Sequence, residues 1–191
     1  MGKYTCRAIE ENEYRKIILL LRTGYEFDGV KHRPNDQIAT ILTVQANLGC
    51  RIGDIMALTT DSIIRDGGIW RLNITEQKTG KKRYFIVPQR LKDFIDDYCR
   101  CCGIREGNIF DINSRAVHKQ LRAVTGYLGL ENVSTHSFRK KFACEIYDRN
   151  GHDIQLTCQA LQHASVATTQ LYIKRSDAQM EKALTDIVSI A

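Results

Sequence analysis

The sequence is poor in the features that mark disordered, membrane-spanning or secreted chains. It has only two prolines among 191 residues, and 43% of its residues are apolar, which argues against a disordered chain. No stretch is long and apolar enough to cross a bilayer. The N-terminal segment MGKYTCRAIEENEYRK has no apolar core of the kind that a secretory signal requires. We therefore expect a cytoplasmic protein.

The cysteines do not form a recognisable framework. There are seven, an odd number that does not suit a set of disulfides. The run CRCC holds Cys99 and Cys102 in a C-x-x-C spacing, but no second pair of ligands follows at a distance suited to zinc. We favour reduced thiols on the last turn of a helix over a metal site. The sequence also contains no Walker motif and no carboxylate cluster.

The charge of the chain indicates the class of partner. The formal net charge is +6 and the isoelectric point is near 9.0. A basic balance favours binding to a polyanion, with nucleic acid as the first candidate. Charge alone is weak support, since many basic domains bind no nucleic acid.

Apolar residues recur at helical spacing over most of the chain. Gly24 and Gly49 are expected helix ends, and a polar loop is expected over 25–34. Asn35 or Asp36, Ser114 and Asp153 are expected N-caps. The predicted helices are 8–24, 37–49, 52–59, 89–102, 114–128, 136–149, 153–161, 165–174 and 177–190.

One region near the middle has a different pattern. GIWRLNIT (68–75) and KRYFIVP (82–88) alternate in part, and the polar segment between them contains a glycine. This predicts a β-hairpin with a cationic tip. The expected fold class is therefore mostly α with a small antiparallel β-sheet, an α+β arrangement, and the length fits one globular domain.

Two segments each place a candidate cation beside a predicted turn. LGCRIGDIMAL (48–58) sets Arg51 just after a helix-ending glycine, at the start of a short helix. EQKTGKKRYFIVP (76–88) sets Lys78 on the predicted hairpin. Taken alone, Arg51 could be a solvent-exposed surface charge, and Lys78 could belong to a solvated or phosphate-contacting turn.

Two further segments add histidines, an arginine and a tyrosine. STHSFRKKFA (134–143) holds His136 and Arg139 three residues apart, on one face of a predicted helix. LQHASVATTQLYI (161–173) sets His163 and Tyr172 nine residues apart, with small and hydroxyl residues between them. Singly, His136 could cap a helix, Arg139 could be an exposed charge and Tyr172 could pack with a wetted hydroxyl.

Together, the four segments resemble the catalytic domain of the tyrosine recombinases, the phage-type integrases. The resemblance runs from about Cys6 to Arg175, and it is carried by six residues that occur in the family's order and local context: Arg51, Lys78, His136, Arg139, His163 and Tyr172. Joint occurrence favours the family over coincidence. Departures are Gln162 in place of the family's glycine, Phe138 in place of leucine and Cys50 in place of a larger apolar residue.

The resemblance implies a mechanism in which Tyr172 attacks a DNA phosphodiester and forms a 3′-phosphotyrosyl bond. Arg51 and Arg139 would clamp the negative charge that builds on the phosphate. His136 would act as base, and Lys78 would protonate the departing 5′ oxygen. His163 would donate a hydrogen bond to the phosphate. Neither a metal nor a nucleotide would be required.

Nearby charged residues have more than one interpretation. Asp54 fits the family's acidic position and could orient Arg51, although an ordinary acid in a helix's first turn fits equally. Lys140 and Lys141 could contact the DNA backbone, but we expect a solvated helix face.

The resemblance also bears on domains and partners. The family usually carries a separate N-terminal core-binding domain, and here the pattern begins almost at the first residue, so we expect a catalytic domain over 1–191 without it. The segment 177–191 is expected to form a tail helix that packs within the chain or docks on a neighbouring protomer. The implied partners are double-stranded DNA and further copies in a tetrameric synapse, in a bacterial, phage or mobile-element context.

Three functions remain to be weighed. The first is a site-specific recombinase or integrase. The second is a type IB topoisomerase-like enzyme that nicks and reseals, and the third is a basic DNA-binding regulator without catalysis. The intact His-x-x-Arg and the nine-residue spacing to Tyr172 favour the recombinase.

Overall fold

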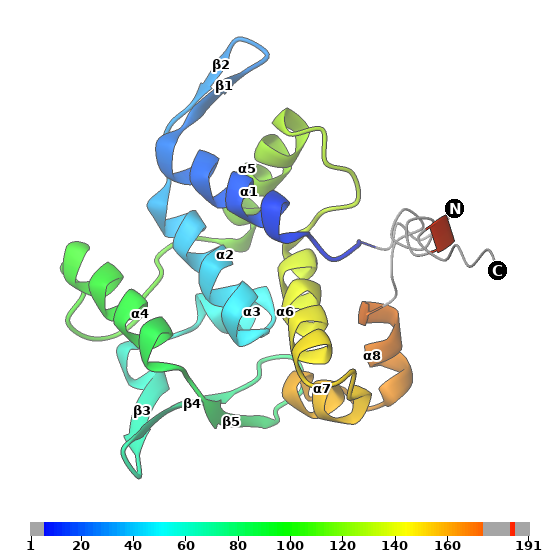
Figure 1. The fold of residues 1–191 in the computed structure, drawn as a ribbon. Helices are drawn as coiled ribbons and strands as arrows, with labels where there is room; N and C mark the ends of the chain where they lie inside the picture. Colours follow the sequence, from blue (N-terminus) through cyan, green and yellow to red (C-terminus); the bar gives the residue numbers. More distant parts are fainter. Residues whose placement is uncertain (1–5, 174–183, 186–191) are drawn as a thin grey trace. The chain divides into compact units, whose positions relative to one another are not determined.

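The computed structural model describes residues 6–173 and 184–185, and the chain divides into two compact units (Figure 1). The first unit ends at Phe142 and the second begins at Ala143. One helix, α6 (Thr135–Arg149), begins in the first unit and ends in the second. None of the helices in the described part of the chain has the length and apolarity needed to span a membrane.

The core of the first unit is built around α2 (Asp36–Leu48). Nine of its 13 residues are buried, because it contacts three other helices of the unit. Asn35 accepts a hydrogen bond from the Ile38 N–H, and Gly49 ends the helix in a left-handed conformation, as predicted. The remaining helices of this unit are α1 (Glu11–Thr23), α3 (Ile52–Met56), α4 (Gln89–Cys101) and α5 (Ser114–Tyr127).

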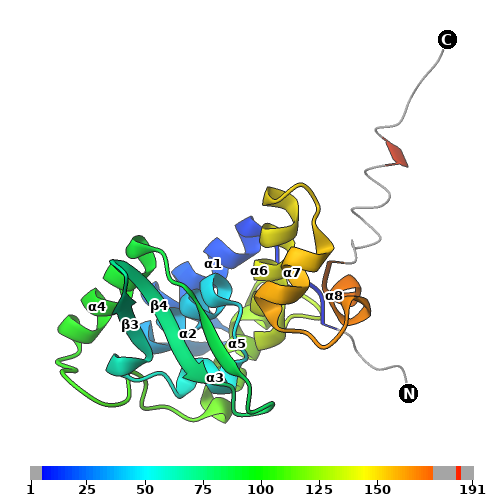
Figure 2. The ribbon, with the colours of Figure 1, turned by 90° about the horizontal axis from the view of Figure 1, so that it is seen from below.

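The predicted hairpin is present and belongs to a three-stranded antiparallel sheet. The strands β3 (Ile63–Asp66), β4 (Ile69–Thr75) and β5 (Lys82–Ile86) pair in the order β3-β4-β5. A short 3-10 helix, η1 (Thr60–Ser62), precedes β3. Figure 2 shows the sheet alongside α4, where the Trp70 indole donates to Gln89 and Lys92 lies 4.5 Å from the Trp70 ring centroid.

The polar loop expected over 25–34 is a second hairpin, so that prediction is wrong. The strands β1 (Tyr25–Phe27) and β2 (Val30–His32) pair antiparallel, and the hairpin projects from the helices of the first unit (Figure 1). Asp28 and Gly29 form its two-residue turn with φ of 49° and 71°. An Asp-Gly pair is a strong signal for such a turn, because both central residues need positive φ.

The start of the first helix and the N-cap of α5 also differ from the prediction. The first helix begins at Glu11 rather than at residue 8, where the Glu10 N–H donates to the Glu13 carboxylate and Arg7 forms an ion pair with Glu13. In α5 the N-cap is Asn113 rather than Ser114, because the Asn113 side chain accepts from the Ala116 N–H.

The second unit contains the end of α6, then α7 (Ile154–Leu161) and α8 (Val166–Ile173), which contact each other. Asp153 caps α7 as predicted, with its carboxylate accepting from the N–H groups of Gln155 and Leu156. The predicted helix over 177–190 lies outside the described residues, except for Leu184 and Thr185, which are helical.

Candidate active site

Arg51 is placed at the N-cap of α3 by the turn that ends α2. Its side chain is 22% exposed, and its Nη1 lies 2.6 Å from Oε2 of Glu76. Glu76 follows β4 and is fully buried. The guanidinium therefore lies at the edge of the first unit, held by a carboxylate beneath it.

Arg139 is fully buried in the first half of α6. Its Nη1 donates to the carbonyl oxygen of Gly49 at 2.5 Å. Gly49 has φ of 59°, and a Cβ there would overlap the Phe142 ring, so glycine is needed on steric and conformational grounds. The alternative of an exposed helical charge at Arg139 is excluded by its burial.

Lys78 lies exposed in the turn between β4 and β5. The backbone of that turn is fixed on both sides: the Gly80 N–H donates to the Glu76 carbonyl, and the Gln77 N–H donates to the Asp54 carboxylate at 2.9 Å. Asp54 is buried in α3. Its carboxylate thus anchors the turn that carries Lys78, a contact that the sequence did not predict.

His136 lies half-buried near the start of α6. The Ser134 side chain accepts from the His136 N–H, so serine rather than His136 caps this helix. Burial lowers the pKa of His136, and the positive charges of Arg139, Lys140, Arg51 and Lys78 lower it further. Arg51, Lys78 and Arg139, which come from three segments of the first unit, therefore lie near enough to His136 for their charges to act on it.

His163 and Tyr172 both lie in the second unit, and their rings contact each other. The ring centroids are 4.6 Å apart and the planes are 80° to each other, an edge-to-face arrangement. Nδ1 of His163 lies 3.0 Å from the hydroxyl of the buried Thr169. The carbonyl of Tyr172 accepts a weak hydrogen bond from the Cys144 thiol at 3.7 Å.

The three departures from the family pattern fit the structure. Gln162 ends α7 in a left-handed conformation, with φ of 52° and ψ of 38°, which is the conformation that glycine adopts most readily. The His163 N–H still donates to the Cys158 carbonyl at 3.1 Å. Phe138 and Cys50 are fully buried, as packing residues should be, and burial raises the pKa of the Cys50 thiol to about 11.

The expected solvated face at Lys140 and Lys141 is wrong. They are only 5% and 6% exposed. Lys140 donates to the carbonyl of Cys6 at 2.5 Å, and Lys141 pairs with Glu11 at 2.9 Å and lies over the Tyr14 ring. Both lysines therefore tie α6 to the N-terminal part of the first unit.

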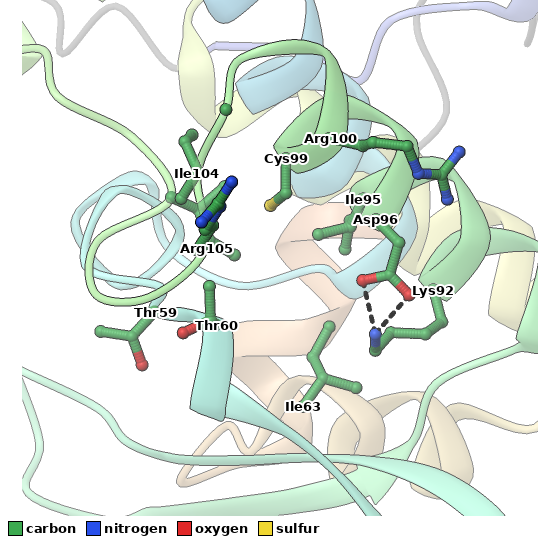
Figure 3. A pocket seen from close by; sticks show the side chains of 12 residues that line it. Thr59, Thr60, Ile63, Lys92, Ile95, Asp96, Cys99, Arg100, Ile104 and Arg105 are labelled. Carbon is green, nitrogen blue, oxygen red and sulfur yellow. Dashed lines mark hydrogen bonds and ion pairs between the residues drawn. The ribbon is translucent and has the colours of Figure 1, made fainter.

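A cavity of about 590 Å³ lies elsewhere in the first unit, between α4 and the segment before β3 (Figure 3). Two of its three cations are engaged locally: Lys92 donates to both oxygens of Asp96, and Arg100 pairs with Asp97. None of the six predicted site residues lines it. All seven cysteines are free thiols, and the described residues contain no group of three or more His, Cys, Asp or Glu suited to a metal.

Comparison with known sequences identifies a family that this chain matches. The sequence model of the phage integrase family matches residues 7–179. The probable integrase/recombinase YoeC of Bacillus subtilis is 30% identical over 133 residues, which are 66% of this chain and 71% of YoeC. Tyrosine recombinase XerA of Pyrococcus furiosus is 25% identical over 187 residues, which are 93% of this chain and 60% of XerA.

Solved structures with the same fold include recombinases and integrases. The crystal structure of XerA recombinase superposes with a TM-score of 0.69 at 20% identity, covering 100% of this chain and 67% of that one. A lambda integrase tetramer bound to a Holliday junction gives a TM-score of 0.68 at 16% identity, covering 93% of this chain and 52% of that one. The predicted fold class is confirmed.

Proposed function

The chain belongs to the phage integrase family of tyrosine recombinases, and on that premise we propose that it breaks and rejoins DNA strands at specific sites. The observation that carries this proposal is the convergence of Arg51, Lys78, His136 and Arg139 in the first unit, with the pKa of His136 lowered there by burial and by the surrounding cations. A neutral imidazole among cations suits proton transfer beside a bound phosphate.

The phosphate would be bound by Arg51 and Arg139. Attack on a phosphodiester adds negative charge to its non-bridging oxygens, and guanidinium groups offer several donors in one plane. Gly49 links the two arginines, because it accepts from Arg139 and lies two residues before Arg51. Loss of one such donor typically costs about 3–4 kcal/mol of barrier.

Tyr172 would be the nucleophile. Its phenol oxygen forms a bond to phosphorus, its proton passes to His136, and the bond from phosphorus to the 5′ oxygen breaks. The departing 5′ oxygen takes a proton from Lys78, whose exposed position on the turn gives it reach. The 3′-phosphotyrosyl bond retains the energy of the phosphodiester, so the reverse reaction reseals the strand without a nucleotide or a metal.

His163 would donate a hydrogen bond to the phosphate. When the Thr169 hydroxyl donates to Nδ1, the ring proton lies on Nε2, which makes that nitrogen a donor. The edge contact with the Tyr172 ring keeps the imidazole close to the nucleophile.

The proposed partners are double-stranded DNA and further copies of the protein. One structure of the same fold is a lambda integrase tetramer on a Holliday junction, which supports self-association on DNA. The chain covers 60% of the length of XerA and 48% of a XerC from Methylobacterium. A cytoplasmic location and a role in a mobile element complete the proposal.

The test is covalent capture of DNA. The protein is incubated with a randomised pool of nicked duplexes, and SDS-resistant adducts are scored for wild type, Tyr172→Phe and Tyr147→Phe. Tyr147 is a matched control, because it is a half-buried tyrosine of the second unit outside the predicted set. We expect adducts from wild type and Tyr147→Phe only, with DNA binding retained in Tyr172→Phe.

Three results would contradict the proposal. Adducts formed by Tyr172→Phe would mean that another group is the nucleophile, and DNA binding without any adduct would favour the non-catalytic regulator. Relaxation of supercoiled plasmid without sequence preference would favour the topoisomerase-like enzyme. Sequencing of the trapped DNA defines the target site.

A further inference from the structure

A fully buried carboxylate lies beneath the candidate active site. Glu76 follows β4 and begins the turn that carries Lys78, and its exposed fraction is 0%. Its backbone closes that turn, since its N–H donates to the Lys81 carbonyl and its carbonyl accepts from the Gly80 N–H. The backbone position from which the Glu76 side chain extends is therefore fixed by hydrogen bonds.

Three side chains from two parts of the first unit donate to this carboxylate. Oε2 accepts from Nη1 of Arg51 at 2.6 Å and from the Thr79 hydroxyl at 2.7 Å. Oε1 accepts from Nη1 of Arg83 at 3.2 Å, and Arg83 is itself fully buried. Charge-assisted contacts of this kind are stronger than neutral ones, and burial reduces their screening by solvent.

The carboxylate stays ionised near neutral pH. Burial raises the pKa of Glu76, but hydrogen bonds from Thr79 and Arg51 and the charges of Arg51 and Arg83 together hold it below its ordinary value. A fixed negative charge is thus present beside Arg51.

The contact has a clear consequence for Arg51. A long side chain at a partly exposed position loses rotamer freedom when it must take one geometry. Glu76 fixes the guanidinium through Nη1, and a guanidinium has five donors in all, so a phosphate can be bound by others. Fixing the donor before substrate arrives lowers the cost of charge stabilisation in the transition state.

A second contact locks the same two elements together. The Gln77 N–H donates to Asp54, which lies three residues after Arg51 on α3. The Glu76 carboxylate of the turn thus accepts from Arg51 at the start of α3, and the Asp54 carboxylate of α3 accepts from the backbone of the turn. The Glu76 contact with Arg51 therefore rests on a fixed relation between α3 and the hairpin.

From these contacts we infer that Glu76 is a positioning residue that holds the Arg51 guanidinium in place for the scissile phosphate. The inference rests on the proposed function, because it assigns a role within the same reaction. Glu76 itself does not touch the DNA, since it is buried beneath Arg51.

The test uses Glu76→Gln, which keeps the shape of the side chain and removes its charge. Single-turnover adduct formation is measured on the duplex defined by sequencing of trapped DNA. We expect the rate constant to fall by about 10- to 100-fold, by analogy with the loss of a hydrogen-bond partner that orients a metal-ligating side chain. Non-covalent DNA affinity should stay equal or rise, because a negative charge near the phosphate is removed. A purely structural defect would lower both the rate constant of adduct formation and the non-covalent affinity for DNA.

A second substrate tests whether the effect of Glu76→Gln on the rate acts through Arg51. Replacement of one non-bridging oxygen of the scissile phosphate by methyl removes the negative charge that the arginine neutralises. The deficit of Glu76→Gln should therefore shrink to less than about threefold on this methylphosphonate. An equal deficit on both substrates would overturn the inference.

Two further variants serve as controls. Asp66→Asn makes the same chemical change in an exposed carboxylate of the same sheet, which pairs with Arg71 at 3.1 Å, and should leave the rate unchanged. If Glu76→Gln does not fold, Thr79→Val removes one bond to the same Oε2 at an exposed position. The rate constant of adduct formation should then fall by only about 2- to 5-fold on the phosphodiester, and by less on the methylphosphonate.

The outcomes separate the inference from the proposed function. Wild-type adducts together with an unchanged rate in Glu76→Gln would overturn the inference alone. No Tyr172-dependent adduct from wild type would overturn the proposed function, and this inference with it.

Discussion

The imidazole of His136 sits among more positive charge than an ordinary histidine meets. Desolvation and the neighbouring cations both disfavour its protonated form, so its pKa lies below the ordinary 6.5. In the proposed mechanism, the neutral form of His136 accepts the Tyr172 proton. A lowered pKa would therefore keep such a base in its neutral form over a wider range of pH.

This predicts the pH dependence of cleavage. The rate of adduct formation should be flat from about pH 7 upward and should fall as pH drops through a midpoint below 6.5. The measurement is a single-turnover rate profile on a nicked duplex, with His136→Gln alongside. The variant should be slower and should lose this acidic limb. An acidic limb that persists in His136→Gln would assign the titration to another group.

The burial and partners of individual charged residues near the site could not be predicted from the sequence. The six residues of the proposed site follow from their order and local context, but the burial of Lys140 and Lys141 does not. Their partners, Cys6 and Glu11, lie about 130 positions away in the chain, and charged residues in a helix ordinarily face water. Glu76 was missed for the same reason, because an acid in a basic turn resembles a solvated pair.

Among the glycines of the described residues, Gly49 in the turn from α2 to α3 leaves the least room for an added Cβ. Gly49 takes a left-handed conformation, its carbonyl holds Arg139, and Phe142 lies against its Cα. A glycine without such neighbours is Gly103, which follows α4 with φ of 70° and has no atom within 4 Å of an added Cβ.

The two glycines predict different costs for one added methyl group. Gly49→Ala should reduce the free energy of unfolding by about 2–5 kcal/mol, as left-handed strain and overpacking against the Phe142 ring add together. Gly103→Ala should cost only about 1 kcal/mol from the strain. Urea unfolding followed by circular dichroism measures both. Equal costs would show that the Phe142 ring moves aside freely.

Elements with strong local signals were predicted well. Helix α2 has both its capping asparagine and its terminal glycine at the expected residues, and β4 and β5 follow their alternating pattern. The β1–β2 hairpin was missed because each strand has only three residues, too few for alternation to be recognised. Its Asp28-Gly29 turn was the available signal.

For the molecule as a whole, the net charge is consistent with the DNA partner that the family resemblance implies. The net charge is +6, and three exposed lysines lie in the turn between β4 and β5 and at the first residue of β5: Lys78, Lys81 and Lys82. Cations that bind DNA phosphates release bound counterions, and affinity therefore falls with salt in proportion to the number of phosphates that the protein neutralises. The salt dependence of DNA affinity in charge-removing variants can thus distinguish a general excess of positive charge from a local set of phosphate-binding cations.

The last prediction uses that difference. In Lys81→Ala/Lys82→Ala, the slope of log affinity against log salt should become shallower by about 0.9 for each phosphate that the variant no longer neutralises, or by about 1.8 if both lysines bind DNA. Lys31→Ala/Arg33→Ala removes the same charge from exposed residues at the end of the β1–β2 hairpin and should leave the slope nearly unchanged. Fluorescence anisotropy titrations at several salt concentrations provide the slopes. If both double variants change the slope equally, total charge rather than the β4–β5 turn governs DNA binding.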